Sequence, residues 1–396
     1  MRIVIVDTTV HGTEIGGGHL YLPPLMKGLI EKGHDVHLVV KDEPNEKINS
    51  LIKASGVTVH KKPWQKNGLV EITAPLFADW VNEMKPDVYF ISASGDIGWV
   101  ALPLLDPSIA AITVGHTDSE TFYLPARHYH SFLTKAIGVS HEVCDHYHTD
   151  CKIPSERIDW IPYGVITSET PPDISDNGIL EMVYVGRVVE EQKRISDLIK
   201  VATILSAKNI NFKLTIVGDG PDMPKVRSIL EREITGGKVV LTGWIANPEI
   251  IEILRRSEVF VLTSAYEGFC IALTEAMANG CCPVVTDIRS GNKYLVKDSF
   301  NGFITKVGDT ARFAMRLEEL AEDNDKLSRM RMQAWNAGKQ FSISKMTDDY
   351  EKCFLSAAEL AKKSLRKKDP AFQLMSTCRS KYPRWIRNIK MAVKGN

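Results

Sequence analysis

The sequence predicts an α/β protein made of two doubly wound domains, each with a parallel β-sheet packed against helices. Short apolar runs alternate with longer amphipathic stretches along most of the 396 residues. These runs fall into two sets, and the polar, proline-rich stretch 168–178 separates the sets. A hydrophobic content of 44% is enough for two ordinary cores in a chain of this length.

The apolar runs that we expect to form strands are three to five residues long. In the first half they are residues 3–6, 36–40, 57–60, 88–92, 111–114 and 136–139. In the second half they are residues 182–185, 213–217, 239–241, 259–262 and 283–285. From about Lys306 to Lys363 the pattern is mostly helical. We therefore expect a first domain at residues 1–167, a second at 168–345, and a C-terminal helix with a basic tail at 346–396.

The composition argues against several classes of function. The formal net charge is zero, which argues against non-specific binding of nucleic acid. The seven cysteines show no paired Cys-x-x-Cys framework, so we expect a reduced, cytoplasmic protein. No cysteine or carboxylate pattern typical of a metal site surrounds the histidines. We therefore expect no bound metal, and we place His146 and His148 at the surface.

No segment predicts insertion into a membrane. The first apolar run is interrupted by Asp7, too early for a signal peptide, and no run approaches the roughly 18 residues of a membrane span. The C-terminal tail is strongly basic, and its apolar residues fall on one helical face: Trp385, Ile386, Ile389 and Val393. This pattern predicts a short amphipathic helix suited to an anionic membrane surface. A solvated tail is the alternative.

Two glutamates follow the predicted strand 259–262. Glu267 lies on the loop that leaves this strand, and Glu275 lies inside the helix predicted for residues 271–279. Ligands of open α/β sheets bind beyond the carboxyl ends of the strands, where carboxylates accept hydrogen bonds from paired hydroxyls. Free amides around residues 269–271 suit an anion. The element thus fits a sugar nucleotide, although an exposed turn glutamate and a surface helix glutamate would produce the same spacing.

The loop after the strand 182–185 carries two cations. An arginine such as Arg187 can donate to two phosphate oxygens at once, and Lys193 adds a point charge. Together they would neutralise a diphosphate without a metal. Surface salt bridges with Glu190 and Glu191 are the alternative.

A glycine-rich loop follows the first predicted strand. Gly16, Gly17 and Gly18 would let backbone amides approach a phosphate or a sugar closely. The loop matches neither the dinucleotide-binding fingerprint nor a Walker loop. Taken alone, it is also explained by a tight turn.

In this order along the chain, these motifs resemble those of retaining glycosyltransferase family 4, the group 1 glycosyl transferases with the GT-B fold. The donor-binding half is matched by residues 185–187 with the following lysine, 216–221, 241–243 and the Glu267 to Glu275 element. The first half is matched by the glycine loop 16–18, by 138–140 and by the hinge sequence 161–165. The resemblance covers about residues 1–350 and implies two Rossmann-like domains that face a central cleft, with the acceptor on the first and the donor on the second.

The resemblance implies a role for each matched residue of the second domain. Arg187 and Lys193 would hold the donor diphosphate and stabilise the departing nucleotide. Glu275 would accept hydrogen bonds from the ribose hydroxyls. Glu267 would contact the transferred sugar together with the amides of Gly268, Phe269 and Cys270.

The first domain would contribute to the same donor site. Gly16 and Gly17 would abut the diphosphate, and His116 resembles the family histidine near the reacting face of the sugar. An exposed histidine at a strand end is the alternative for His116. The chain departs from the family at Cys270, where a glycine is common, and at Tyr163, where the hinge often has asparagine. We do not expect Cys270 to act as a nucleophile.

The implied function is transfer of a hexose-type sugar from a nucleotide-diphosphate sugar to an acceptor hydroxyl, with retention of configuration. The reaction would need no metal and no cofactor besides this co-substrate, for which a UDP-sugar is the commoner choice in the family. The product would be a surface glycan or another glycoconjugate.

The acceptor site is predicted from fewer residues. The expected acceptor wall is Phe122, Tyr123, Arg127 and His128, although an aromatic core segment explains these residues as well. The basic tail indicates a glycan or lipid-linked acceptor and peripheral contact of a cytoplasmic protein with the inner face of the membrane.

Three other functions fit parts of the pattern. A sugar-nucleotide epimerase shares the two-domain architecture but needs additional carboxylates for elimination. A nicotinamide-dependent dehydrogenase needs a dinucleotide fingerprint that the chain lacks. A non-catalytic sugar-nucleotide-binding protein would keep the donor site without turnover.

Overall fold

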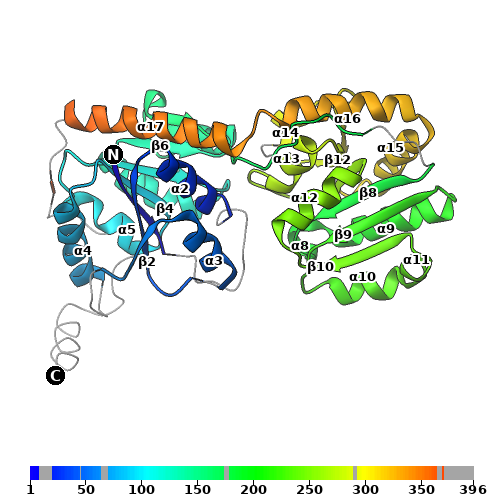
Figure 1. Cartoon of the computed structure of the whole chain (residues 1–396), viewed down its shortest axis with the longest axis horizontal. Helices are drawn as coiled ribbons and strands as arrows, with labels where there is room; N and C mark the ends of the chain where they lie inside the picture. The colour runs from blue at the N-terminus through cyan, green and yellow to red at the C-terminus, as the bar shows by residue number, and fades with distance from the viewer. Residues whose placement is uncertain are drawn as a thin grey trace, which may run out of the picture. The chain divides into compact units, whose positions relative to one another are not determined.

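The computed structural model contains two compact units, shown with their elements in Figure 1. The first unit comprises residues 1–162 and 346–396, and the second comprises residues 163–345. The first boundary thus lies five residues before the predicted one. The structure describes residues 1–8, 20–44, 46–63, 70–173, 178–288, 292–363 and 368–369.

The first unit is built on a seven-stranded sheet in the order β3-β2-β1-β4-β5-β6-β7, in which neighbouring strands pair in parallel. All six runs predicted for this half coincide with strands to within one residue. The seventh strand, β7, was not predicted, because it is a three-residue edge strand without an apolar run. The strands are β1 (Arg2–Asp7), β2 (Asp35–Val40), β3 (Thr58–Lys61), β4 (Val88–Ala93), β5 (Ala110–Gly115), β6 (Lys135–Gly138) and β7 (Ile158–Trp160).

The second unit is built on a six-stranded parallel sheet in the order β10-β9-β8-β11-β12-β13. The five predicted runs are found, and the edge strand β13, which ends in Thr305 and Lys306, was not predicted. The strands are β8 (Leu180–Val185), β9 (Phe212–Val217), β10 (Val239–Gly243), β11 (Val259–Leu262), β12 (Cys282–Asp287) and β13 (Phe303–Lys306).

Helices connect these strands and cover the sheets. In the first unit they are α2 (Leu22–Glu31), α3 (Glu46–Ser55), α4 (Val70–Met84), α5 (Asp96–Val100), α6 (Glu120–Tyr129) and α7 (His141–Thr149). In the second unit they are α8 (Glu190–Lys193), α9 (Ile195–Ala207), α10 (Met223–Ile229), α11 (Glu231–Thr235), α12 (Asn247–Arg256), α13 (Ile271–Ala278), α14 (Asn292–Leu295), α15 (Thr310–Glu322) and α16 (Asn324–Gly338). A final helix, α17 (Ile343–Lys363), follows them.

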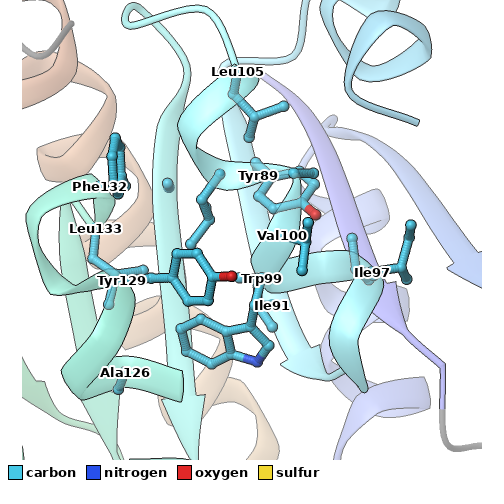
Figure 2. Close-up of a cluster of buried hydrophobic side chains, with 14 of the residues drawn as sticks. Tyr89, Ile91, Ile97, Trp99, Val100, Leu105, Ala126, Tyr129, Phe132 and Leu133 are labelled. Carbon is cyan, nitrogen blue, oxygen red and sulfur yellow. The ribbon is translucent and has the colours of Figure 1, made fainter. Parts of the chain in front are cut away.

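One part of the core of the first unit lies between its sheet and helices α4 to α7. Figure 2 shows part of it, where the rings of Tyr89, Trp99 and Tyr129 lie among aliphatic side chains. The Tyr89 hydroxyl is buried but donates to the Gly98 carbonyl at 2.8 Å, so its polar atom is satisfied. Burial of such large apolar surfaces is the main stabilising term for this unit.

Helix α17 packs on the first unit, so the helical part of the C-terminal segment that we predicted as a separate region belongs to that unit. Its apolar face carries Tyr350 and Phe354, whose rings lie 5.8 and 5.3 Å from that of Phe90 in β4. Its polar edge carries Glu351, which bonds to Lys32 and His34 at 2.9 and 2.8 Å. The helix is amphipathic, and the sheet of the first unit supplies the surface that buries its apolar face.

Candidate functional site

In the second unit, the sheet order brings the loops after β8, β9 and β11 to one edge. The first two of these loops contact each other through their backbones, where Val188 N–H donates to the Asp219 carbonyl at 2.9 Å. A Cβ atom at Gly218 would lie 2.0 Å from the Gly186 oxygen, and one at Gly220 would lie 2.2 Å from the Val188 oxygen. The Gly-Asp-Gly motif is therefore explained by close backbone approach, which positions the loop after β8.

Lys193 and Glu267 form a buried ion pair at this edge. The Lys193 Nζ lies 2.6 Å from Glu267 Oε1, and the two side chains are 11% and 8% exposed. Burial disfavours the lysine charge, but the surrounding groups, the Glu267 carboxylate first among them, together outweigh that effect and raise the pKa of Lys193 above its ordinary value. The Ser264 hydroxyl donates to the same carboxylate oxygen at 2.6 Å. Neither an exposed turn glutamate nor a surface salt bridge of Lys193 with Glu190 or Glu191 describes this arrangement.

Gln192 joins Arg187 to this pair. Its Oε1 accepts from Arg187 Nη2 at 3.4 Å, and its Nε2 donates to Glu267 Oε2 at 3.4 Å. The Arg187 carbonyl also accepts from the Tyr184 hydroxyl at 2.8 Å, while the arginine itself is exposed. Gln192 and Ser264 were not predicted from the sequence. Their position next to Lys193 and at the end of β11 was the available signal, but a single amide and a single hydroxyl form no motif.

Cys270 lies among the charged groups of the site. It is the N-cap of α13 and is 4% exposed. Burial raises the pKa of its thiol to about 12, and the charges of Glu267, Lys193 and Glu275 also act on it. The thiol therefore stays protonated near neutral pH, which agrees with our expectation that it is no nucleophile. The structure thus brings these three charged residues near one sulfur atom.

The other predicted residues between Glu267 and Glu275 have their packing partners within the second unit. Glu275 is 8% exposed within α13, so it is not a surface helix residue. Phe269 is buried, and its ring lies 5.8 Å from that of Tyr163 and 6.0 Å from that of Phe341. Gly268 lies before it on the half-buried part of the loop. Aromatic packing therefore holds the segment between the two glutamates.

In the first unit, His116 follows β5 and is 6% exposed. Its Nε2 lies 3.2 Å from the Ser92 carbonyl oxygen. The ring is flanked by Tyr21 and Phe122, at centroid distances of 5.1 and 5.4 Å. The alternative of an exposed histidine at a strand end is therefore wrong. Gly16 and Gly17 lie outside the described residues.

The predicted acceptor residues all lie on α6 but in different surroundings. Phe122 is half-buried against His116, whereas Tyr123 is in the core and donates to Asp118 Oδ1 at 3.0 Å. The other two have partners on the same helix. Arg127 pairs with Glu120 at 3.3 Å, and the His128 ring lies edge-on to Tyr129. The core interpretation thus holds for Tyr123.

The described residues contain neither a metal-binding cluster nor a helix suited to cross a membrane. No group of three or more histidine, cysteine, aspartate or glutamate side chains in these parts of the chain could hold a metal ion. None of the helices in these parts is both long enough and apolar enough to cross a membrane. His146 is half-buried on α7 and stacks on Tyr123, while His148 is exposed.

Comparison with known families decides what kind of protein carries this site. The family model described as "Glycosyltransferase Family 4" matches residues 15–169, and "Glycosyl transferases group 1" matches residues 174–337. The chain belongs to this glycosyltransferase family. The fold agrees, because its two Rossmann-like units are those of the GT-B glycosyltransferases.

Individual relatives match only part of this chain. The chain is 30% identical over 178 residues to the lipopolysaccharide 1,6-galactosyltransferase of Escherichia coli K12, a match of 44% of this chain and 48% of that protein. It is also 30% identical to the Escherichia coli UDP-Gal:alpha-D-GlcNAc-diphosphoundecaprenol alpha-1,3-galactosyltransferase, over 42% and 46% of the two chains. The matches thus span about half the length of these curated relatives.

Solved structures extend the likeness to most of the chain. HepE from Anabaena, in complex with UDP and glucose, superposes with a TM-score of 0.72 over 90% of this chain and 100% of that one. The sequence identity is 18%, so this likeness shows the GT-B fold alone.

Proposed function

We propose that this glycosyltransferase moves a hexose from a nucleotide-diphosphate sugar to an acceptor hydroxyl, with retention at the anomeric carbon. One observation carries the proposal: a buried ammonium–carboxylate pair, Lys193 and Glu267, is joined through Gln192 to the exposed guanidinium of Arg187 at the carboxyl ends of β8 and β11. Ligands of open α/β sheets bind at this edge.

The donor is proposed to be a UDP-hexose. One relative is named for UDP-galactose, and the solved HepE structure holds UDP and glucose. In this chain Arg187 and Lys193 would bind the diphosphate, and Glu275 would accept hydrogen bonds from the ribose. Glu267, already fixed by Lys193 and Ser264, would orient the hexose together with the amides of the loop before α13.

The chemistry would depend on stabilisation of the leaving group. As the bond between the anomeric carbon and the diphosphate breaks, negative charge develops on phosphate oxygens near Arg187 and Lys193. The acceptor hydroxyl would attack from the same face, and a phosphate oxygen would take its proton. Side-chain cations would supply the charge that a metal supplies in other enzymes, so we propose metal-independent transfer.

Transfer and nucleotide binding can be measured on matched variants. We expect Arg187→Ala and Glu275→Ala to lower transfer at least tenfold and to reduce the thermal stabilisation that UDP confers. Arg255→Ala is the control, because Arg255 is an exposed arginine of the same unit that pairs with Glu252 on α12. Undiminished transfer in both site variants would contradict the assignment. A new nucleotide sugar formed without acceptor would instead indicate an epimerase.

The acceptor is proposed to be a glycan or a lipid-linked intermediate in surface-glycan synthesis. The support comes from relatives named for lipopolysaccharide and for a diphosphoundecaprenol substrate, and from the basic sequence of residues 370–396. Deleting these 27 residues should weaken sedimentation with anionic vesicles and leave transfer to a water-soluble acceptor intact. Unchanged sedimentation would remove the membrane contact from the proposal.

A further inference from the structure

A β-bulge interrupts the first sheet next to His116. The pairing of β1 with β4 runs from Val6 opposite Ile91 to Asp7 opposite Ala93, so Ser92 is an extra residue on β4. Bulges re-aim side chains and occur often beside active sites. Because β4 lies between β1 and β5, Ser92 can contact residues of both strands and of the loops that follow them.

The Ser92 hydroxyl forms two hydrogen bonds within the core. It donates to Asp7 Oδ2 at 3.2 Å, and its oxygen lies 2.8 Å from the Tyr21 hydroxyl. Since a hydroxyl has a single proton, Ser92 must accept the second bond from Tyr21. Burial strongly raises the pKa of Tyr21, which keeps that phenol protonated and able to donate. All three residues are at most 2% exposed.

The Ser92 carbonyl contacts His116, which follows the neighbouring strand β5. Its oxygen lies 3.2 Å from His116 Nε2 and can only accept, so Nε2 carries a proton. In the neutral imidazole Nδ1 is then the acceptor nitrogen. The rings of Tyr21 and Phe122 flank the imidazole and limit its rotation.

We propose that Ser92 is a positioning residue for His116. Tyr21 and Asp7 fix the bulge that directs the Ser92 carbonyl toward His116. Held in this way, His116 keeps one tautomer and one orientation. The effect of this orientation on transfer rests on the proposed function, whereas the tautomer does not.

The test uses the full chain with ¹⁵N-labelled histidine. Nuclear magnetic resonance should show His116, assigned by the signal lost in His116→Gln, as the Nε2–H tautomer. Ser92→Ala should give a mixture of tautomers and lower kcat about fivefold or more, with little change in the donor KM. Tyr21→Phe, which removes only a hydroxyl, should act in the same direction and serves if Ser92→Ala does not fold.

The matched control is Thr113→Val, since Thr113 is a buried residue of β5 whose hydroxyl also reaches a β4 carbonyl, that of Ile91. It should change neither the tautomer nor kcat. Equal losses in the control, or an unchanged tautomer in both Ser92→Ala and Tyr21→Phe, would overturn the inference. If the wild-type protein transfers no sugar, the proposed function fails, and the tautomer measurement still decides the role of Ser92.

Discussion

At the scale of single residues, the Lys193–Glu267 pair has more than one possible role. The desolvation energy of two buried charges can exceed the energy of their attraction, so such a pair is weak evidence for a stabilising function. Its position beside Arg187 at the carboxyl ends of the strands instead favours a functional role. Stability and activity measurements can separate the two.

We expect Lys193→Met to destabilise the protein by about 3 kcal/mol, because Glu267 would remain as an unpaired buried charge. The double variant Lys193→Met with Glu267→Leu should regain most of that stability, since both charges are gone. Neither variant should transfer sugar. Denaturant unfolding and a transfer assay test this, and an active double variant would show that the pair only stabilises the fold.

At the scale of elements, the loop after β8 depends on glycines in the loop after β9. Gly220→Ala should destabilise the protein and lower transfer, because its Cβ would lie 2.2 Å from the Val188 oxygen and displace the loop that carries Arg187. Gly237→Ala is the comparison. Its φ of +78° would be strained for alanine, but nothing lies within 4 Å of the added Cβ. We expect it to cost about 1 kcal/mol without loss of transfer. Equal effects on transfer would contradict this account.

The attachment of α17 to the first unit includes a titratable contact. Lys32 first and His34 second lower the pKa of Glu351 from its usual 4.5. The carboxylate therefore contributes stability that is fully present above pH 4.5 and is lost as the pH falls through its lower folded-state pKa. We expect Glu351→Gln to lower the melting temperature at pH 7 by up to about 2 °C, because the pair is partly exposed.

Melting curves from pH 7 to pH 3 check this prediction. The difference between wild type and Glu351→Gln should shrink as the pH falls below 4.5. Lys352→Gln is a suitable control, since the neighbouring Lys352 is exposed and only approaches Asp349 at 4.0 Å. A difference that stays constant with pH would mean that Glu351 acts through packing alone.

At the scale of the whole molecule, the chain begins in the first unit, forms the second with residues 163–345, and returns to the first at residue 346. Deletion of residues 346–396 should therefore unfold or aggregate the first unit, because it exposes Phe90 and the other apolar residues under α17. A stable protein ending at residue 345 would show that α17 is dispensable for folding.

The sequence predicted eleven of the thirteen strands that the structure describes, including the edge strands β3 and β10, and missed the other edge strand of each sheet. Central parallel strands read as continuous apolar runs, whereas the missed strands β7 and β13 are only three and four residues long and contain polar residues. The charged site residues were predicted because they recur in motifs at fixed spacing. Gln192, Ser264 and Ser92 were not, since each acts through a hydrogen bond between segments distant in sequence.

By itself, the sequence determined two parallel α/β units and the family motifs, because both depend on local periodicity and short-range spacing. The tertiary structure decided that Lys193 pairs with Glu267 at 2.6 Å, that Tyr123 is in the core, and that α17 belongs to the first unit. Each of these depends on which segments the folded chain brings together. Burial and hydrogen bonding between such segments are set by packing, which spacing along the chain does not encode.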